Sequence, residues 1–132
     1  MKVKYQFLAQ GHKNIRATHK ATIEFTKDSH ITEKGDCIVA VNSKFDIEEL
    51  KKFPGRNRIS IEIECSGVTE RLTAIPSQSF ESNNEIVVRK TEYISSRTFA
   101  INADKSAAEL NRELIKKLSR GSPATITITE ID

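Results

Sequence analysis

The chain of 132 residues contains no tryptophan, one methionine and only two cysteines, and each scarcity narrows what the protein can be. Cys37 and Cys65 both lie in apolar strand-like segments, where a cysteine is most often a buried free thiol. No Cys-x-x-Cys pair is present, which argues against a zinc ribbon or a thioredoxin-like redox motif. No apolar run approaches the roughly 20 residues that a membrane-spanning helix needs, so we expect no membrane partner.

Aromatic residues are also scarce, at 6% of the sequence, and only two of them are tyrosines. The phenylalanines fall mostly at core positions, so the exposed aromatic platform of an RNA-recognition motif or an OB-fold is not visible. The sequence lacks the short motifs, based on glycine, histidine or serine, that mark four common enzyme classes. These classes are nucleotide hydrolases, dinucleotide-binding enzymes, zincins and α/β-hydrolases. These enzyme classes are therefore disfavoured, and the sequence leaves open whether the protein is an enzyme.

The net charge of +3 is too small to indicate nucleic-acid binding by itself. The positive charge is concentrated in residues 1–20, which contain five lysines and arginines and no Asp or Glu. This segment either attracts an anion or forms a solvated strand face whose lysines protect an edge. Lysines alternate with apolar residues in 1–10, which is unlike a signal peptide, so we expect a cytoplasmic location.

Apolar residues recur with a period of two along much of the chain, which predicts a mainly β protein. The run 37–41 is apolar throughout, as is typical of a central strand, and 124–131 is predicted to be an edge strand. We expect a single domain over 1–132 with a β-sandwich-like fold and two helices; an α+β arrangement is the alternative. About eight strands are predicted, at 2–9, 16–26, 37–41, 59–65, 68–75, 85–90, 97–102 and 124–131.

Two segments carry helix signals. Asp46 is expected to cap the first helix, with Glu49 three residues later completing a capping box. The second helix is predicted over 104–120, with Asp104 as its cap. Its apolar stripe, which should face the core, consists of Ala107, Leu110, Leu114 and Leu118.

His19 lies on the apolar face of the segment 16–26. It alternates with Ala17 and Ala21, so its side chain is predicted to point towards the core or a cavity. A core histidine satisfied by a hydrogen bond is one interpretation. The small neighbours leave room beside the ring, which favours a pocket instead.

His12 lies with Asn14 in a predicted loop and is either an ordinary surface histidine or a ligand contact. If the loop folds over the next strand, His12 and His19 could meet and, with Asp36 or Cys37, bind zinc or iron. The seven residues that separate the two histidines match no short-range metal motif. We therefore predict no metal and no cofactor.

Arg89 and Arg97 share strand faces with apolar residues, where a guanidinium needs a carboxylate or an anion. An internal ion pair with Glu24 or Asp36 is one interpretation. A fork that binds a phosphate or carboxylate of a ligand is the other. The candidate ligand-binding residues are therefore His12, Asn14, His19, Glu24, Asp36, Arg89 and Arg97.

Four blocks of sequence contain most of these residues: GHKN at 11–14, THKATIEFT at 18–26, GDCIVAV at 35–41 and RKTEYISSRTF at 89–99. Their combined order resembles an archaeal family of unknown function, DUF371, over nearly the whole length. The resemblance implies a small standalone domain with a β-sandwich-like fold, and it supplies no activity, cofactor or catalytic residue. Its shared polar and turn positions would be Gly11, His12, Asn14, His19, Thr22, Glu24, Gly35, Cys37, Arg89 and Arg97. Ala21 departs from a pair of hydroxyl residues that the family pattern suggests.

The sequence leaves three functions open, and binding of a small anionic or nucleotide-like ligand, or of RNA, ranks first. This hypothesis predicts that Arg89 and Arg97 line one cleft beside His12 or His19. The third-ranked function is a homo-oligomeric interaction module that associates through the strand 124–131.

The second-ranked function is an enzyme that uses His12 or His19 as a general acid or base. A carboxylate, Glu24 or Asp36, would orient the ring. By the phase of its strand, Glu24 points away from His19, which weakens that pairing. The sequence names no reaction.

Overall fold

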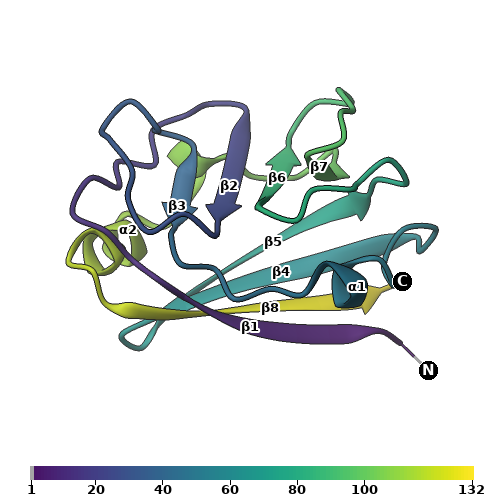
Figure 1. Ribbon diagram of the computed structural model, residues 1–132, viewed down its shortest axis with the longest axis horizontal. Helices are drawn as coiled ribbons and strands as arrows, with labels where there is room; N and C mark the ends of the chain where they lie inside the picture. The colour runs from purple at the N-terminus through teal and green to yellow at the C-terminus, as the bar shows by residue number, and fades with distance from the viewer. Residues whose placement is uncertain (1) are drawn as a thin grey trace.

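The computed structural model describes residues 2–132 and shows the mainly β fold that the sequence predicts. Eight strands form one mixed sheet in the order β1-β8-β4-β5-β7-β6-β2-β3, with two short α-helices beside it (Figure 1). The helices are α1 (Ile47–Leu50) and α2 (Arg112–Ser119). The strands are β1 (Lys4–Gln10), β2 (Thr22–Thr26), β3 (Ile38–Ala40), β4 (Arg58–Cys65), β5 (Val68–Pro76), β6 (Glu85–Arg89), β7 (Thr98–Ile101) and β8 (Pro123–Ile131).

The sheet consists of two halves, which lie one above the other in Figure 1. Strands β1, β8, β4 and β5 pair antiparallel in the first half, and β7, β6, β2 and β3 form the second. β5 pairs with β7 only through Ile75 and Pro76, so the sheet bends there. At the two ends of the strand order, Gln10 of β1 and Val41, which follows β3, exchange backbone hydrogen bonds of 2.9 and 2.8 Å. The sheet therefore curls back on itself, and its halves enclose one core as in a sandwich.

The period-two pattern of the sequence accounts for this core. In β4 the side chains of Ile61 and Ile63 are buried, and they lie opposite Ile128 and Ile126 of β8. Removing one such side chain from water contributes about 1.5–3 kcal/mol. The buried face of α2 covers the end of the core with Leu114 and Leu118, and α2 contacts β3, β4 and β5.

The predictions about which strands lie at an edge are wrong. The predicted edge strand 124–131 forms β8, which pairs with β1 on one side and β4 on the other. Both of its edges are occupied, so it does not offer the association edge that the oligomer hypothesis requires. The predicted central strand 37–41 forms β3, which ends the strand order. Its Val39 and Ala40 are buried because the sheet curls over them. An apolar run therefore indicates that the side chains of a strand are buried, but it does not show whether both edges of the strand are paired.

The predicted strand 16–26 is shorter than expected, because only Thr22–Thr26 pairs as β2. Ala17 adopts a left-handed conformation with φ of 51°, which interrupts an extended strand. The amides of Thr18 and His19 both donate to the carbonyl of Asp36, at 3.0 and 3.3 Å. Two successive amides that donate to one carbonyl form a turn and do not pair as a strand ladder. His19 therefore lies half-buried in a loop, whereas the sequence predicted a strand position facing the core.

The predicted helix 104–120 divides into a 3₁₀ turn (Ala107–Glu109) and α2. Leu110 between them is extended, with φ of −68° and ψ of 151°. Asp104 caps neither piece, because its carboxylate accepts the amide of Thr73 at 2.9 Å. Asn111 caps α2 instead, since its side chain accepts the amide of Glu113 at 2.8 Å. The predicted apolar stripe is nonetheless buried.

Asp46 caps α1 as predicted, and its carboxylate accepts the amide of Glu48 at 2.9 Å. Glu49 does not complete the expected capping box. The amide of Asp46 donates to the hydroxyl of Tyr5 in β1, at 2.9 Å, which no local sequence pattern indicates. Within residues 2–132, neither helix is long and apolar enough to cross a membrane.

Candidate functional site

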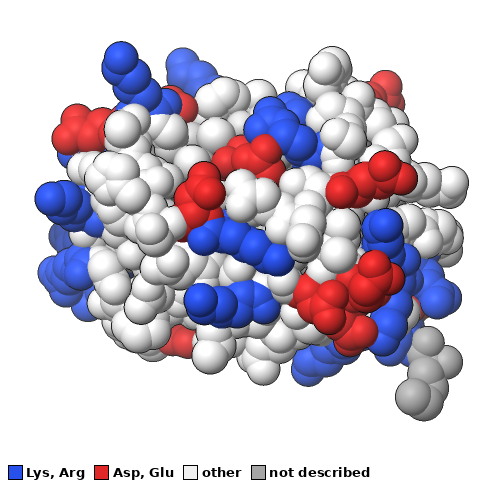
Figure 2. All heavy atoms as spheres, in the orientation of Figure 1, with Lys and Arg blue, Asp and Glu red and all other residues white. Residues whose placement is uncertain are grey.

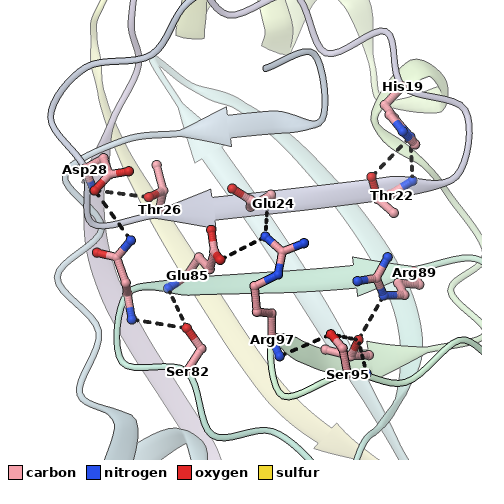
Figure 3. Close-up of polar contacts among 12 residues, drawn as sticks. His19, Thr22, Glu24, Thr26, Asp28, Ser82, Glu85, Arg89, Ser95 and Arg97 are labelled. Carbon is pink, nitrogen blue, oxygen red and sulfur yellow. Dashed lines mark hydrogen bonds and ion pairs between the residues drawn. The ribbon is translucent and has the colours of Figure 1, made fainter. Parts of the chain in front are cut away.

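A row of polar side chains lies on the outer face of the second half of the sheet (Figure 3). Alternation along β2 directs Ile23 and Phe25 into the core and places Glu24 on the opposite face. The antiparallel partner β6 and the start of β7 add Arg89 and Arg97 to the same face. Three of the candidate residues, from two separate sequence blocks, therefore come together.

Arg97 forms the internal ion pair that the sequence offered as one interpretation. Its Nη1 lies 2.9 Å from Oε1 of Glu85 and 3.8 Å from Oε1 of Glu24. Glu85 was missing from the candidate set, because its proximity follows from the pairing of β2 with β6 and not from any motif. With two carboxylates beside it, the guanidinium of Arg97 is already neutralised.

Glu24 is 8% exposed, and its environment changes its acidity. Burial raises the pKa of Glu24 to about 7, and the charge of Glu85 and a hydrogen bond with it act in the same direction. The positive charge of Arg97 opposes this rise in pKa. The hydrogen bond to Glu85 in turn raises the pKa of Arg97. With its pKa of about 7, the carboxyl group of Glu24 can hold and release a proton near neutral pH.

Arg89 has a different environment from Arg97. Its Nε donates to Oγ1 of Thr98 at 2.9 Å, and its guanidinium lies 4.8 Å from the centroid of the Tyr93 ring. Within the described chain, neither terminal nitrogen donates to a protein acceptor and no carboxylate forms an ion pair with it. The predicted ion pair of Arg89 with Glu24 or Asp36 is therefore not formed, and the two terminal nitrogens are open to a ligand.

His19 lies at the same end of the β2–β6 pair as Arg89 (Figure 3). Its Nδ1 accepts the amides of Ala21 and Thr22, at 3.1 and 3.2 Å, and contacts the hydroxyl of Thr22 at 3.1 Å. Because Nδ1 uses its lone pair to accept these amides, the ring proton is on Nε2. Thr22 is the direct cross-strand partner of Arg89, so the ring of His19, which contacts Thr22, lies near the strand end that carries Arg89.

His12 and Asn14 have other partners. The ring of His12 packs against His30, with centroids 5.1 Å apart, and its Nδ1 accepts the amide of Asn14 at 3.0 Å. Burial, followed by the charges of His30 and Lys13, lowers the pKa of His12. The side chain of Asn14 donates to the carbonyl of Ile31 at 2.8 Å. These contacts join two loops, and the ring that meets His12 is His30, which no motif indicated.

Asp36 acts mainly through its backbone, although its carboxylate also accepts the hydroxyl of Thr18 at 3.4 Å. Cys37 follows it as a half-buried free thiol, and burial raises its pKa. In the part of the chain that the structure describes, no three His, Cys, Asp or Glu side chains lie close enough to hold a metal. Nor does any histidine there pair with a carboxylate, so the acid–base pair of the enzyme hypothesis is not formed.

A hollow of about 520 Å³ lies elsewhere, where β1 and β8 meet the segment that follows β3. The exposed side chain of Leu8 contributes to its wall, and Gln10 and Asn42 are hydrogen bonded there at 2.6 Å. None of the candidate residues lines it. The hollow is lined by Leu8, Ala9, Gln10, Asn42, Lys44, Glu64, Pro123, Ala124 and Thr125.

The fold and the site define a small mainly β protein with a curled mixed sheet and an arginine-bearing outer face. A family model described as a domain of unknown function, DUF371, matches residues 7–131, and the chain belongs to this family, as its sequence blocks predicted. An uncharacterized protein of Methanocaldococcus jannaschii is 38% identical over 120 residues, which cover 86% of this chain and 89% of that protein.

Proposed function

We propose that the protein binds a small anionic ligand through Arg89, with His19 and Thr22 beside the bound group. The observation that carries the proposal is the half-buried residue Arg89, whose guanidinium is held in place and has no carboxylate partner within residues 2–132. A guanidinium presents its terminal N–H groups as a rigid fork that matches a phosphate or a carboxylate.

The surroundings of Arg89 hold its side chain in one orientation. Thr98 accepts Nε–H, and its Oγ1 also accepts the amide of Ser95 at 3.0 Å, which fixes the acceptor itself. Tyr93 packs against the guanidinium. A side chain that is already ordered loses less entropy when it binds, so this arrangement favours affinity for an anion.

The proposal uses one arginine, whereas the sequence suggested two. Arg97 is on the same face, but Glu85 and Glu24 compensate its charge. An anion there would displace a 2.9 Å ion pair and would leave a largely buried carboxylate without its partner. Arg97 therefore supports the structure of the face, and Arg89 is the group available to a ligand.

The charge distribution favours a small ligand over a long strand of RNA. Acidic and basic side chains are interspersed on the face that Figure 2 shows. The basic N-terminal segment is partly paired, with Lys2 2.9 Å from Asp132 and Arg16 2.8 Å from Glu33. Binding of a nucleic-acid strand depends on many phosphate contacts from unpaired lysines and arginines. A small anion needs only one strong site and fits the predicted cytoplasmic location.

The test is a calorimetric and NMR titration of the full chain with inorganic phosphate and pyrophosphate at low ionic strength. Arg89→Gln should weaken binding by roughly 10- to 100-fold, the usual value of charge-assisted hydrogen bonds. Arg58→Gln is the matched control, because Arg58 also donates to a threonine hydroxyl, that of Thr73 at 3.1 Å. Equal binding by both variants, or no binding by the wild type, would overturn the proposal.

A further inference from the structure

The loop between β6 and β7 exposes two large apolar side chains beside Arg89. Tyr93 is 63% exposed and Ile94 is 48% exposed, and both follow the end of β6 by a few residues. Exposed aromatic side chains next to a polar site commonly mark a binding surface. The scarcity of aromatic residues in the sequence makes this position informative, because the other tyrosine, Tyr5, is half-buried and accepts a backbone hydrogen bond.

The Tyr93 ring packs against the guanidinium of Arg89. The guanidinium lies 4.8 Å from the ring centroid and occupies one face of the ring. With 63% of the residue exposed, the remaining face and edges are open to solvent. A planar group that stacked on the open face would have the guanidinium behind the ring, an arrangement that strengthens stacking through a cation–π contact.

The loop that carries Tyr93 is tied down at several points. The amide of Lys90 donates to the carbonyl of Ala21 at 2.9 Å, and the amide of Asn102 donates to the carbonyl of Thr91 at 3.1 Å. The amide of Tyr93 itself lies 3.4 Å from Oγ1 of Thr91. The ring is therefore presented on an ordered loop and not on a free one.

We propose that the ligand is a nucleoside monophosphate, whose phosphate binds Arg89 and whose base stacks on Tyr93. This inference rests on the proposed function, since it takes Arg89 as the anion site. A single phosphate matches the charge available, because Lys90 is occupied by Glu109 at 2.7 Å and Arg97 by Glu85. Every base has a stacking face, so the site selects a nucleotide over a simple phosphate without selecting one base strongly.

The experiment compares four probes on the full chain by calorimetry: inorganic phosphate, ribose 5-phosphate, adenosine monophosphate and uridine monophosphate. Both nucleotides should bind at least tenfold more tightly than ribose 5-phosphate, which carries the same phosphate and sugar without a base. Tyr93→Ala should remove that difference and weaken ribose 5-phosphate binding much less than nucleotide binding, because the ring also packs against Arg89. Tyr93→Phe should keep it, and Ile94→Ala is the control for an exposed side chain in the same loop.

The outcomes separate this inference from the proposed function. Equal affinity of the wild type for nucleotides and for ribose 5-phosphate overturns the base-stacking role, while a loss of phosphate binding in Arg89→Gln still supports the anion site. Equal weakening of all four probes by Tyr93→Ala also overturns it, because the ring would then only position Arg89. A single-stranded oligonucleotide that binds more tightly than the monophosphates, with a steep dependence on salt, would identify RNA as the ligand and overturn the monophosphate.

Discussion

Replacing the buried carboxyl group Glu24 with glutamine should make the protein more stable at alkaline pH. The pKa of Glu24 is about 7 in the folded chain, against an ordinary value of 4.5. Between these two values the folded chain keeps a proton that the unfolded chain has lost. The stability of the wild type therefore falls as pH rises from about 4.5 to 7 and stays low above that window. Glu24→Gln removes this loss because an amide cannot ionise.

The size of the effect follows from the same pKa. Each pKa unit corresponds to about 1.36 kcal/mol, so ionising Glu24 would cost the folded state at most about 3 kcal/mol at pH 8. That pKa already includes the charge of Arg97, 3.8 Å away, which opposes the rise. We therefore expect Glu24→Gln to gain roughly 2–3 kcal/mol at pH 8, and almost nothing at pH 4.5.

Urea unfolding followed by circular dichroism at several pH values measures this difference. A gain of that size should raise the urea midpoint by about 1 M at pH 8 for a domain of this length. Glu62→Gln is the control, because Glu62 is an exposed residue of β4. If the stabilities of Glu24→Gln and the wild type stay parallel from pH 4.5 to pH 8, the reasoning about the carboxyl cluster is refuted.

Two further predictions concern other parts of the fold. Gly11→Ala should destabilise the protein by about 3 kcal/mol, because a Cβ there would lie 1.9 Å from the carbonyl oxygen of Leu118. That oxygen belongs to the backbone, so it cannot move aside without shifting α2. An unchanged melting temperature would contradict this prediction. The pKa of Glu109 is lowered to about 2, first by its hydrogen bond with Lys90 and then by the amide and hydroxyl of Ser106. The stabilisation from Glu109 is present above its ordinary pKa and is lost as pH falls towards 2. Lys90→Met should raise the pKa of Glu109 in a carboxyl NMR titration. An unaltered pKa would show that Lys90 does not cause the lowered value.

The sequence determined which side chains are buried and where several turns form, because both depend on neighbours along the chain. Alternation in 59–65 placed its isoleucines in the core without knowledge of the partner strand. Ser66 and Gly67 adopt positive φ angles of 52° and 83°, as the tight turn predicted between two strands requires. Asp46 caps its helix through an amide two residues away.

Local pattern failed where a distant segment supplied the partner. Residues 16–21 alternate like a strand, but the amides of Thr18 and His19 donate to the carbonyl of Asp36 and do not form a strand ladder. The stretch 104–120 has a helical stripe, but Asp104 accepts an amide of β5, and Asn111 starts a shorter helix. The strand 124–131 has the composition of an exposed edge, yet two neighbouring strands cover it.

The same division applies to the site. The sequence identified Arg89 and Arg97 as equivalent, because each is a guanidinium in an apolar strand pattern and each needs a counter-charge. The tertiary structure distinguished them, since the pairing of β2 with β6 brings Glu24 and Glu85 to Arg97 and leaves Arg89 with a hydroxyl and an aromatic ring. Residue type shows that a charge must be compensated, but the compensating group is chosen by strand register, which joins residues far apart in the chain.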